Sequence, residues 1–248
     1  MQQCNNSWEL GTRLLYLNNE AKVKYDDTRA DVDFIRDLNF SQSYLVGEVY
    51  GAIRFAPCFA LTYTFRIPRE DGGWGRLPSA FNFNGVVVPA GSTTNWKFTP
   101  YLIRQEAEYY FATGCNFRVG GILGGEVVIA DTKLEYIDPQ GLAHSLKHTN
   151  AWGVPFIGGV GEYSPMNQVF LRFKGLYNVV PTKASGFTLD GEVRLFPEFG
   201  AGAYGGPSMF RAYVGAGYRY STVNFAESES AKYFLTQHGP YCELGLIF

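Results

Sequence analysis

The sequence lacks long apolar runs and carries little charge. No window approaches the roughly 18 consecutive apolar residues of a transmembrane helix. Charged residues make up only 18% of the chain, against about 25% in soluble domains. There is no run of Lys and Arg and the net charge is −2, so no nucleic-acid-binding surface is predicted. Helical periodicity is missing as well. Given the length of 248 residues, we predict a single domain over residues 1–248.

What the sequence has instead is aromatic residues, glycine and strict alternation. Aromatics make up 17% of the residues, and glycine occurs 29 times. Stretches such as "FALTYTFRI", "VFLRFKGLYNV" and "FTLDGEVRL" place apolar side chains on one face and more polar ones on the other. This pattern is typical of strands with two different faces. In a membrane barrel the apolar face contacts lipid, whereas in a soluble barrel it fills the interior.

Folding neighbouring strands into hairpins brings opposite charges together across the strands. Such pairs are modestly stabilising, and three independent turns produce them, which indicates one polar face continuing around the sheet. That face suits a narrow lumen, so we favour a membrane barrel over a soluble barrel that binds an apolar ligand inside. The predicted pairs are Arg172–Glu192 and Lys174–Asp190 about a centre at 182, Glu48–Arg66 about 57, and Glu108–Arg118 about 113.

The inward positions carry charges of both signs. Barrels of about eight strands are filled by side chains, and open channels appear at about sixteen, so a lumen lined in this way should be occluded or leave a narrow polar pore. The predicted lumen charge network consists of Glu48, Arg66, Glu108, Arg118, Arg172, Lys174, Asp190, Glu192, Arg194, Arg211 and Arg219, with Glu9, Arg13, Arg54, Arg104, Glu106, Glu126 and Glu243 as further inward candidates.

Short and long connections alternate along the chain. "FAPCF", "ATGCN" and "YSPMN" are short, whereas residues 25–39, 69–95 and 136–150 are long and rich in turn formers. Short turns at one end and long loops at the other are typical of outer-membrane barrels. We predict an all-β fold: a transmembrane antiparallel up-and-down β-barrel of about ten strands, with eight or twelve also compatible.

The final strand, "YCELGLIF", resembles the closing strand of Gram-negative outer-membrane β-barrel proteins. The resemblance implies that Tyr241, Leu244, Leu246 and Phe248 form the signal read by the outer-membrane insertion machinery. It also implies an integral outer-membrane location, with long loops extracellular, termini periplasmic, and membrane lipid and lipopolysaccharide as partners. The beginning, "MQQCNNSWEL", does not resemble a signal peptide, so the chain is expected to be the mature form.

The four cysteines all fall toward the predicted periplasmic end. Barrel closure places the first strand beside the last, which makes Cys4–Cys242 a candidate disulfide, and Cys58–Cys115 would join two consecutive turns. The alternative is four unpaired thiols. Their spacing matches no zinc or haem pattern.

The stretch "HSLKHTNAWG" suggests a second possible function. It faintly resembles a motif of outer-membrane lipid A deacylases and phospholipases, which would make His148 a base, Thr149 or Ser145 the nucleophile and Glu162 an orienting carboxylate. The spacing is one residue short, Thr replaces Ser, and Glu162 lies near the other end of its strand. A solvated loop histidine is the simpler interpretation.

Two loops have unusual compositions. The first contains Asp26, Asp27, Asp31, Asp33 and Asp37, which could hold Ca²⁺ but lack calcium-loop spacing and more simply form a solvated surface. The second is apolar and either folds into the barrel mouth or contacts a partner; its apolar members are Trp74, Phe81, Phe83 and residues 85–89.

These observations favour a non-enzymatic protein without cofactor or metal. It would be a narrow passive pore, or a membrane scaffold that engages a periplasmic or surface protein through its loops or periplasmic rim. The alternative is the lipid hydrolase with His148 as base.

Overall fold

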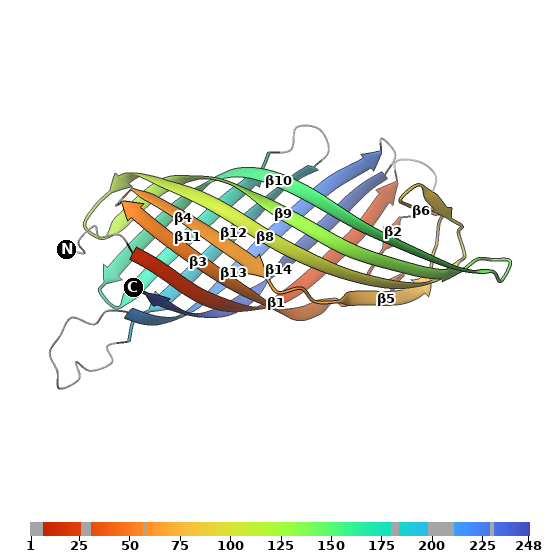
Figure 1. Cartoon of the computed structure of the whole chain (residues 1–248), viewed down its shortest axis with the longest axis horizontal. Coiled ribbons are helices and arrows are strands. Elements are labelled where there is room, and N and C mark those ends of the chain that lie inside the picture. Colours follow the sequence, from red (N-terminus) through yellow and green to blue (C-terminus); the bar gives the residue numbers. More distant parts are fainter. Residues whose placement is uncertain (1–6, 26–30, 57, 180–183, 198–210, 229–230) are drawn as a thin grey trace.

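In the computed structural model, ten strands form a closed antiparallel barrel (Figure 1). Residues 7–25, 31–56, 58–179, 184–197, 211–228 and 231–248 are described, and within them no helix is present. Each barrel strand pairs with the next along the chain, and the last pairs with the first, which confirms the predicted fold. The strands are β1 (Ser7–Tyr25), β3 (Ser43–Ala56), β4 (Phe59–Arg66), β8 (Thr93–Thr113), β9 (Phe117–Ile137), β10 (Ala143–Met166), β11 (Val169–Asn178), β12 (Ala184–Leu195), β13 (Arg211–Ser228) and β14 (Ala231–Ile247).

Four shorter strands lie at the end of the barrel opposite the chain termini (Figure 1). We call this the loop end, and the other the terminal end. β2 (Val32–Asp33) pairs with β1, and β5 (Asp71–Arg76) pairs with β8. β6 (Phe81–Phe83) and β7 (Val86–Val88) form a separate hairpin. The long loop predicted over residues 136–150 is wrong, because β9 and β10 continue to a short turn at residues 138–142.

Three of the four charge pairs predicted from hairpin symmetry are confirmed by the strand register. These are Arg172–Glu192, Lys174–Asp190 and Glu48–Arg66. The Glu108–Arg118 pair is wrong. β8 continues to Thr113 and the hairpin is centred near position 115 rather than 113, so Glu108 lies opposite Ile122 and Arg118 opposite Thr113. A bulge between Tyr110 and Ala112 changes the register by only one residue.

The outer face of the barrel is apolar over a belt and polar beyond it. On β1 the belt runs from Trp8 to Tyr16, close to the 9–11 residues of a tilted transmembrane strand. On β9 it ends near Ile129. The strands therefore extend past the belt toward the loop end, and among the described residues no helix is long and apolar enough to cross a membrane. The polar outward positions beyond the belt are Asn18, Glu20, Lys22 and Lys24 on β1 and Asp131, Lys133 and Glu135 on β9.

At the loop end a hydrophobic core joins both long loops to the inner face of the strands. Phe81 and Val88 are buried, and the partly buried Phe83 packs against them. The apolar second loop therefore folds into the mouth in part, while Trp74 and Val87 stay exposed. This loop-end core comprises Val23, Val32, Leu38, Leu77, Phe81, Val88, Trp96, Leu134 and Tyr136, with Phe34, Phe40, Phe83 and Leu146 packed against it.

Candidate functional site: the lumen and the loop end

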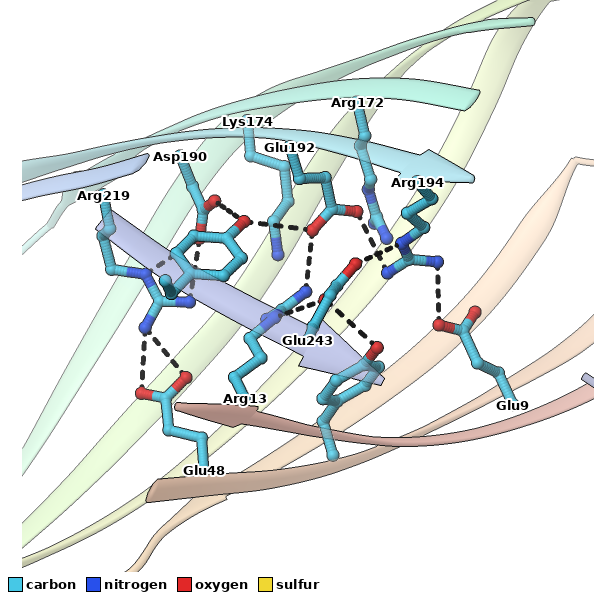
Figure 2. A network of polar contacts seen from close by, with 12 residues as sticks. Glu9, Arg13, Glu48, Arg172, Lys174, Asp190, Glu192, Arg194, Arg219 and Glu243 are labelled. Atoms are coloured by element: carbon cyan, nitrogen blue, oxygen red, sulfur yellow. Dashed lines mark hydrogen bonds and ion pairs between the residues drawn. The ribbon is translucent and has the colours of Figure 1, made fainter. Parts of the chain in front are cut away.

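Glu243 lies at the centre of a buried cluster of charges inside the barrel (Figure 2). Its two carboxylate oxygens accept hydrogen bonds from Arg13 Nε at 2.8 Å and Arg194 Nε at 2.7 Å. Both guanidinium groups also pair with Glu192, at 2.8 and 3.0 Å. The side-chain exposure of these four residues is only 0–4%. Each charge is thus compensated without water, as buried ions require.

A second cluster, around Arg219 and Glu48, lies beside the first (Figure 2). Arg219 donates to both oxygens of Glu48 at 2.9 Å and pairs with Asp190 at 2.8 Å. Arg66 also binds Glu48, at 3.0 Å. The Tyr241 hydroxyl donates to Asp190 at 2.6 Å and so joins the two clusters.

The opposite wall contributes further pairs from β8, β10 and β11. Lys174 Nζ lies 2.9 Å from Glu106, and Arg172 pairs with Glu108. Glu162 forms an ion pair with Arg118 of β9 at 2.9 Å. Lys174 and Arg172 therefore turn away from their cross-strand partners, Asp190 and Glu192, to carboxylates across the lumen.

The charges of the lumen balance. Sequence reasoning assigned Glu162 to a possible catalytic role and did not anticipate the tyrosines, although both occupy inward positions. Arg211, predicted in the network, instead lies at the terminal rim, where it donates to the Asn167 carbonyl and stacks over Phe196. Among the described residues, the ion-paired lumen residues are nine cations and nine carboxylates: Arg13, Arg54, Arg66, Arg104, Arg118, Arg172, Lys174, Arg194 and Arg219, with Glu9, Glu48, Glu106, Glu108, Glu126, Glu162, Asp190, Glu192 and Glu243.

Two tyrosines and two glycines form one row across the closing seam of the barrel. Tyr50, Gly11, Gly245 and Tyr213 lie opposite one another on β3, β1, β14 and β13. The two hydroxyls meet over the glycines. A Cβ on Gly11 would lie 2.4 Å from the Tyr50 ring, and one on Gly245 would lie 2.3 Å from the Tyr213 hydroxyl. Only glycine leaves room for both rings.

The residues of the hydrolase hypothesis are not brought together. His148 faces inward at the loop end, where Asn84 Nδ2 donates to its Nδ1 at 2.9 Å and Nε2 contacts Asn150 Oδ1 at 2.5 Å. Thr149 and Ser145 alternate with it and face outward, and Thr149 donates to Asp131 at 2.7 Å. Glu162, on the same strand, lies deep in the lumen with Arg118. The His148 imidazole has no nucleophile beside it.

The described cysteines are unpaired. Cys58, Cys115 and Cys242 are free thiols, so the predicted Cys58–Cys115 disulfide is wrong. The rim does not bring the two turns together. Cys4 lies outside the described residues, and its predicted partner Cys242 is free.

The acidic first loop uses its described carboxylates locally. Asp33 accepts from the Ile35 and Arg36 amides at 3.1 Å, and Asp37 pairs with Arg36 at 2.8 Å. Asp26 and Asp27 lie outside the described residues. In the part of the chain that is described, no group of three His, Cys, Asp or Glu side chains could hold a metal.

The β9–β10 turn depends on Asp138. Its carboxylate accepts from the Leu142 amide at 2.8 Å and the Gln140 amide at 2.9 Å, and His144 lies 3.2 Å away. The backbone hydrogen bond from Leu142 is the main cause that lowers the Asp138 pKa.

Because the Asp138 pKa is lowered in the folded state, the ionised carboxylate stabilises the turn at pH values above its ordinary pKa of about 3.9. That stability is lost as the pH falls through the lowered pKa of the folded state. We expect Asp138→Ala to accelerate hydrogen exchange of the Leu142 amide at pH 7, and the wild-type turn to match it only below about pH 4. Equal exchange at pH 7 would contradict this prediction.

Comparisons with known proteins agree with the fold. The structure of the outer-membrane protease OmpT from Escherichia coli superposes with a TM-score of 0.51 at 11% identity, covering 98% of this chain and 96% of that one. The outer membrane protein OprG from Pseudomonas aeruginosa gives a TM-score of 0.39 at 10% identity, covering 99% and 97%. No protein-family profile and no curated protein sequence matches.

The molecule thus has the fold of the Gram-negative outer-membrane β-barrels. An identity of 11% establishes the fold alone. The specific activity has to be argued from the lumen and the loop end.

Proposed function

We propose that this protein is an integral outer-membrane barrel with a sealed lumen, which serves as a membrane-anchored scaffold rather than a passive pore. The observation that carries the proposal is the burial of the charged clusters. The side chains around Glu243 and Arg219 are 0–5% exposed although they lie inside the barrel. A water-filled path at this level would leave such groups hydrated.

The scaffold would work through its loop end. The strands extend past the apolar belt there, and the loop-end core fixes both long loops in place. In the proposed orientation this end is extracellular and the termini are periplasmic. Membrane lipid and lipopolysaccharide would surround the belt, and a surface protein would bind the loop end.

The closing strand fits insertion by the outer-membrane machinery. Leu244, Leu246 and Phe248 are exposed on the outer face, where they would be read. Tyr241 faces the lumen instead, since its hydroxyl binds Asp190. We therefore assign the signal to the three outward residues and give Tyr241 a role in the lumen.

Conductance in a planar bilayer tests the seal. Folded wild-type protein, verified by heat-modifiable gel mobility, is expected to give no discrete steps. A variant with Arg13, Glu192, Arg194 and Glu243 all changed to serine removes two charges of each sign, and should conduct because the plug is shortened. Reproducible steps from the wild type would overturn the proposal in favour of a pore.

A further inference from the structure

In the described part of the chain, one strand edge at the loop end has no partner strand. β10 pairs with β9 from Ala143 to Tyr163, but its pairing with β11 begins only at Phe156. No strand of the described part pairs with β10 on that side between Ala143 and Val154. The belt ends on β9 near Ile129, opposite Ala151, so the part of this edge from Ser145 to Thr149 lies past the belt and outside the membrane, and Ala151 and Gly153 lie at its border.

Pro155 explains where the pairing stops. Its carbonyl accepts from the Val179 amide at 2.8 Å, which among the described residues is the last backbone hydrogen bond on this side of β10 toward the loop end. Proline has no N–H to return that bond, so it weakens the ladder at this point. The missing donor faces β11, and pairing with β9 continues undisturbed.

The direction of the Pro155 carbonyl identifies the free backbone groups. In an antiparallel sheet the N–H and C=O of alternate residues point to the same neighbouring strand. Between Ala143 and Pro155, the backbone N–H and C=O groups of odd-numbered residues therefore point toward the free edge, and those of even-numbered residues point toward β9. No described strand pairs with the residues that face this edge, which are Ser145, Lys147, Thr149, Ala151 and Gly153.

Side chains along this edge indicate what would bind. Lys147 is exposed on the outer face and has no ion-pair partner among the described residues. Trp152 shares the inward face with Phe156 and Val160, yet it is 42% exposed. A strand beside β10 would therefore gain from an acidic residue opposite Lys147 and an apolar residue opposite Trp152.

A second copy of this chain does not fit the edge. In one membrane both copies of β10 run from the loop end to the terminal end, so the edges cannot be antiparallel. Barrel strands tilt by about 35–45°, and copies related by a twofold axis along the membrane normal would cross at roughly twice that angle. The occupant is a different polypeptide.

We infer that the β10 edge from Ser145 to Gly153 binds an extended segment of another protein by strand addition. The segment carries an apolar residue opposite Trp152 and an acidic residue five positions later, opposite Lys147. This is β-augmentation, in which backbone hydrogen bonds supply affinity and alternate side chains supply specificity. The inference rests on the proposed scaffold function, for which it identifies the binding site.

Hydrogen exchange of the folded protein in detergent micelles tests the free edge. The five odd-numbered amides should exchange much faster than those of His144, His148 and Trp152, which bind β9. Slow exchange of all of them would show that the edge is covered and would overturn the inference. Protection of the five odd-numbered amides by lipid alone, without any peptide, would also overturn the inference.

Binding is then measured with a synthetic ten-residue peptide of alternating Thr and Val, with Leu and Glu five positions apart. It should protect the five amides, whereas a control peptide with a spacing of four should bind at least about tenfold more weakly. Lys147→Glu should weaken binding by about tenfold. Failure of the first peptide to protect any of the five amides would overturn the inference.

A matched pair of variants separates backbone pairing from other contacts. Ala151→Pro removes one donor facing the free edge and leaves pairing with β9 intact, so peptide binding should be lost. Ala151→Val keeps the donor and should bind as the wild type does. Equal binding by both would exclude strand addition. Conductance remains an independent readout, because a conducting protein refutes the sealed scaffold whether or not the peptide binds.

Discussion

Replacing Glu243 by glutamine is expected to destabilise the barrel by about 3–5 kcal/mol, the range found when one partner of a buried ion pair is removed. Glu243 accepts from Arg13 and Arg194 within a cluster that excludes water. The change keeps the side-chain shape but leaves positive charge in excess beside Glu192. Urea titration of protein refolded in lipid vesicles measures the free energy of unfolding.

Glu135→Gln is the matched control. It is the same chemical change at an exposed position past the apolar belt, where Glu135 pairs with Lys133. Exposed pairs contribute little to stability, so this variant should unfold as the wild type does. If both variants unfold alike, the buried network does not stabilise the fold, and its role is confined to filling the lumen.

Adding one methyl group at Gly75 is expected to displace the first loop from the mouth. A Cβ there would lie 1.9 Å from the Asp37 carbonyl oxygen and 2.8 Å from the Leu38 Cα. These are backbone atoms, so residues 37–40 must move as a segment, and Leu38 and Phe40 would leave the loop-end core. Overpacking of this kind costs about 1–3 kcal/mol.

The displacement should appear in hydrogen exchange. The Phe34 amide donates to Ala21 and the Phe40 amide to Phe34, so both should lose protection in Gly75→Ala. Gly153→Ala serves as the control, because no atom lies within 4 Å of its added Cβ. Unchanged protection in Gly75→Ala would show that the first loop is held independently of β5.

Alternation was sufficient to predict the barrel, its two faces and most of its lumen. The arithmetic of symmetric hairpins located Glu48 opposite Arg66 because the assumed centre at position 57 matches the register of that hairpin. It failed for Glu108 because the centre was placed at 113, whereas the pairing of β8 with β9 is centred near 115. The local sequence does not mark that β8 continues to Thr113 before it turns.

Contacts between distant segments could not be predicted from the sequence. The disulfide prediction assumed that neighbouring turns lean together, which depends on the shape of the whole rim. Lys174 and Arg172 were assigned to cross-strand partners, yet their long side chains reach Glu106 and Glu108 across the lumen. The carboxylates within reach of Lys174 and Arg172 carry the same charge, so the width of the barrel decides which of them each side chain binds. No single hairpin determines that width.

The row of two tyrosines and two glycines also depends on closure of the barrel. Tyr50 and Tyr213 are 163 positions apart in the chain, and their hydroxyls meet only when β1 lies beside β14. The contact therefore cannot exist in a sheet that is still open. It forms only when the barrel closes, and a chemical cross-link between these two rings would distinguish a closed barrel from an open sheet.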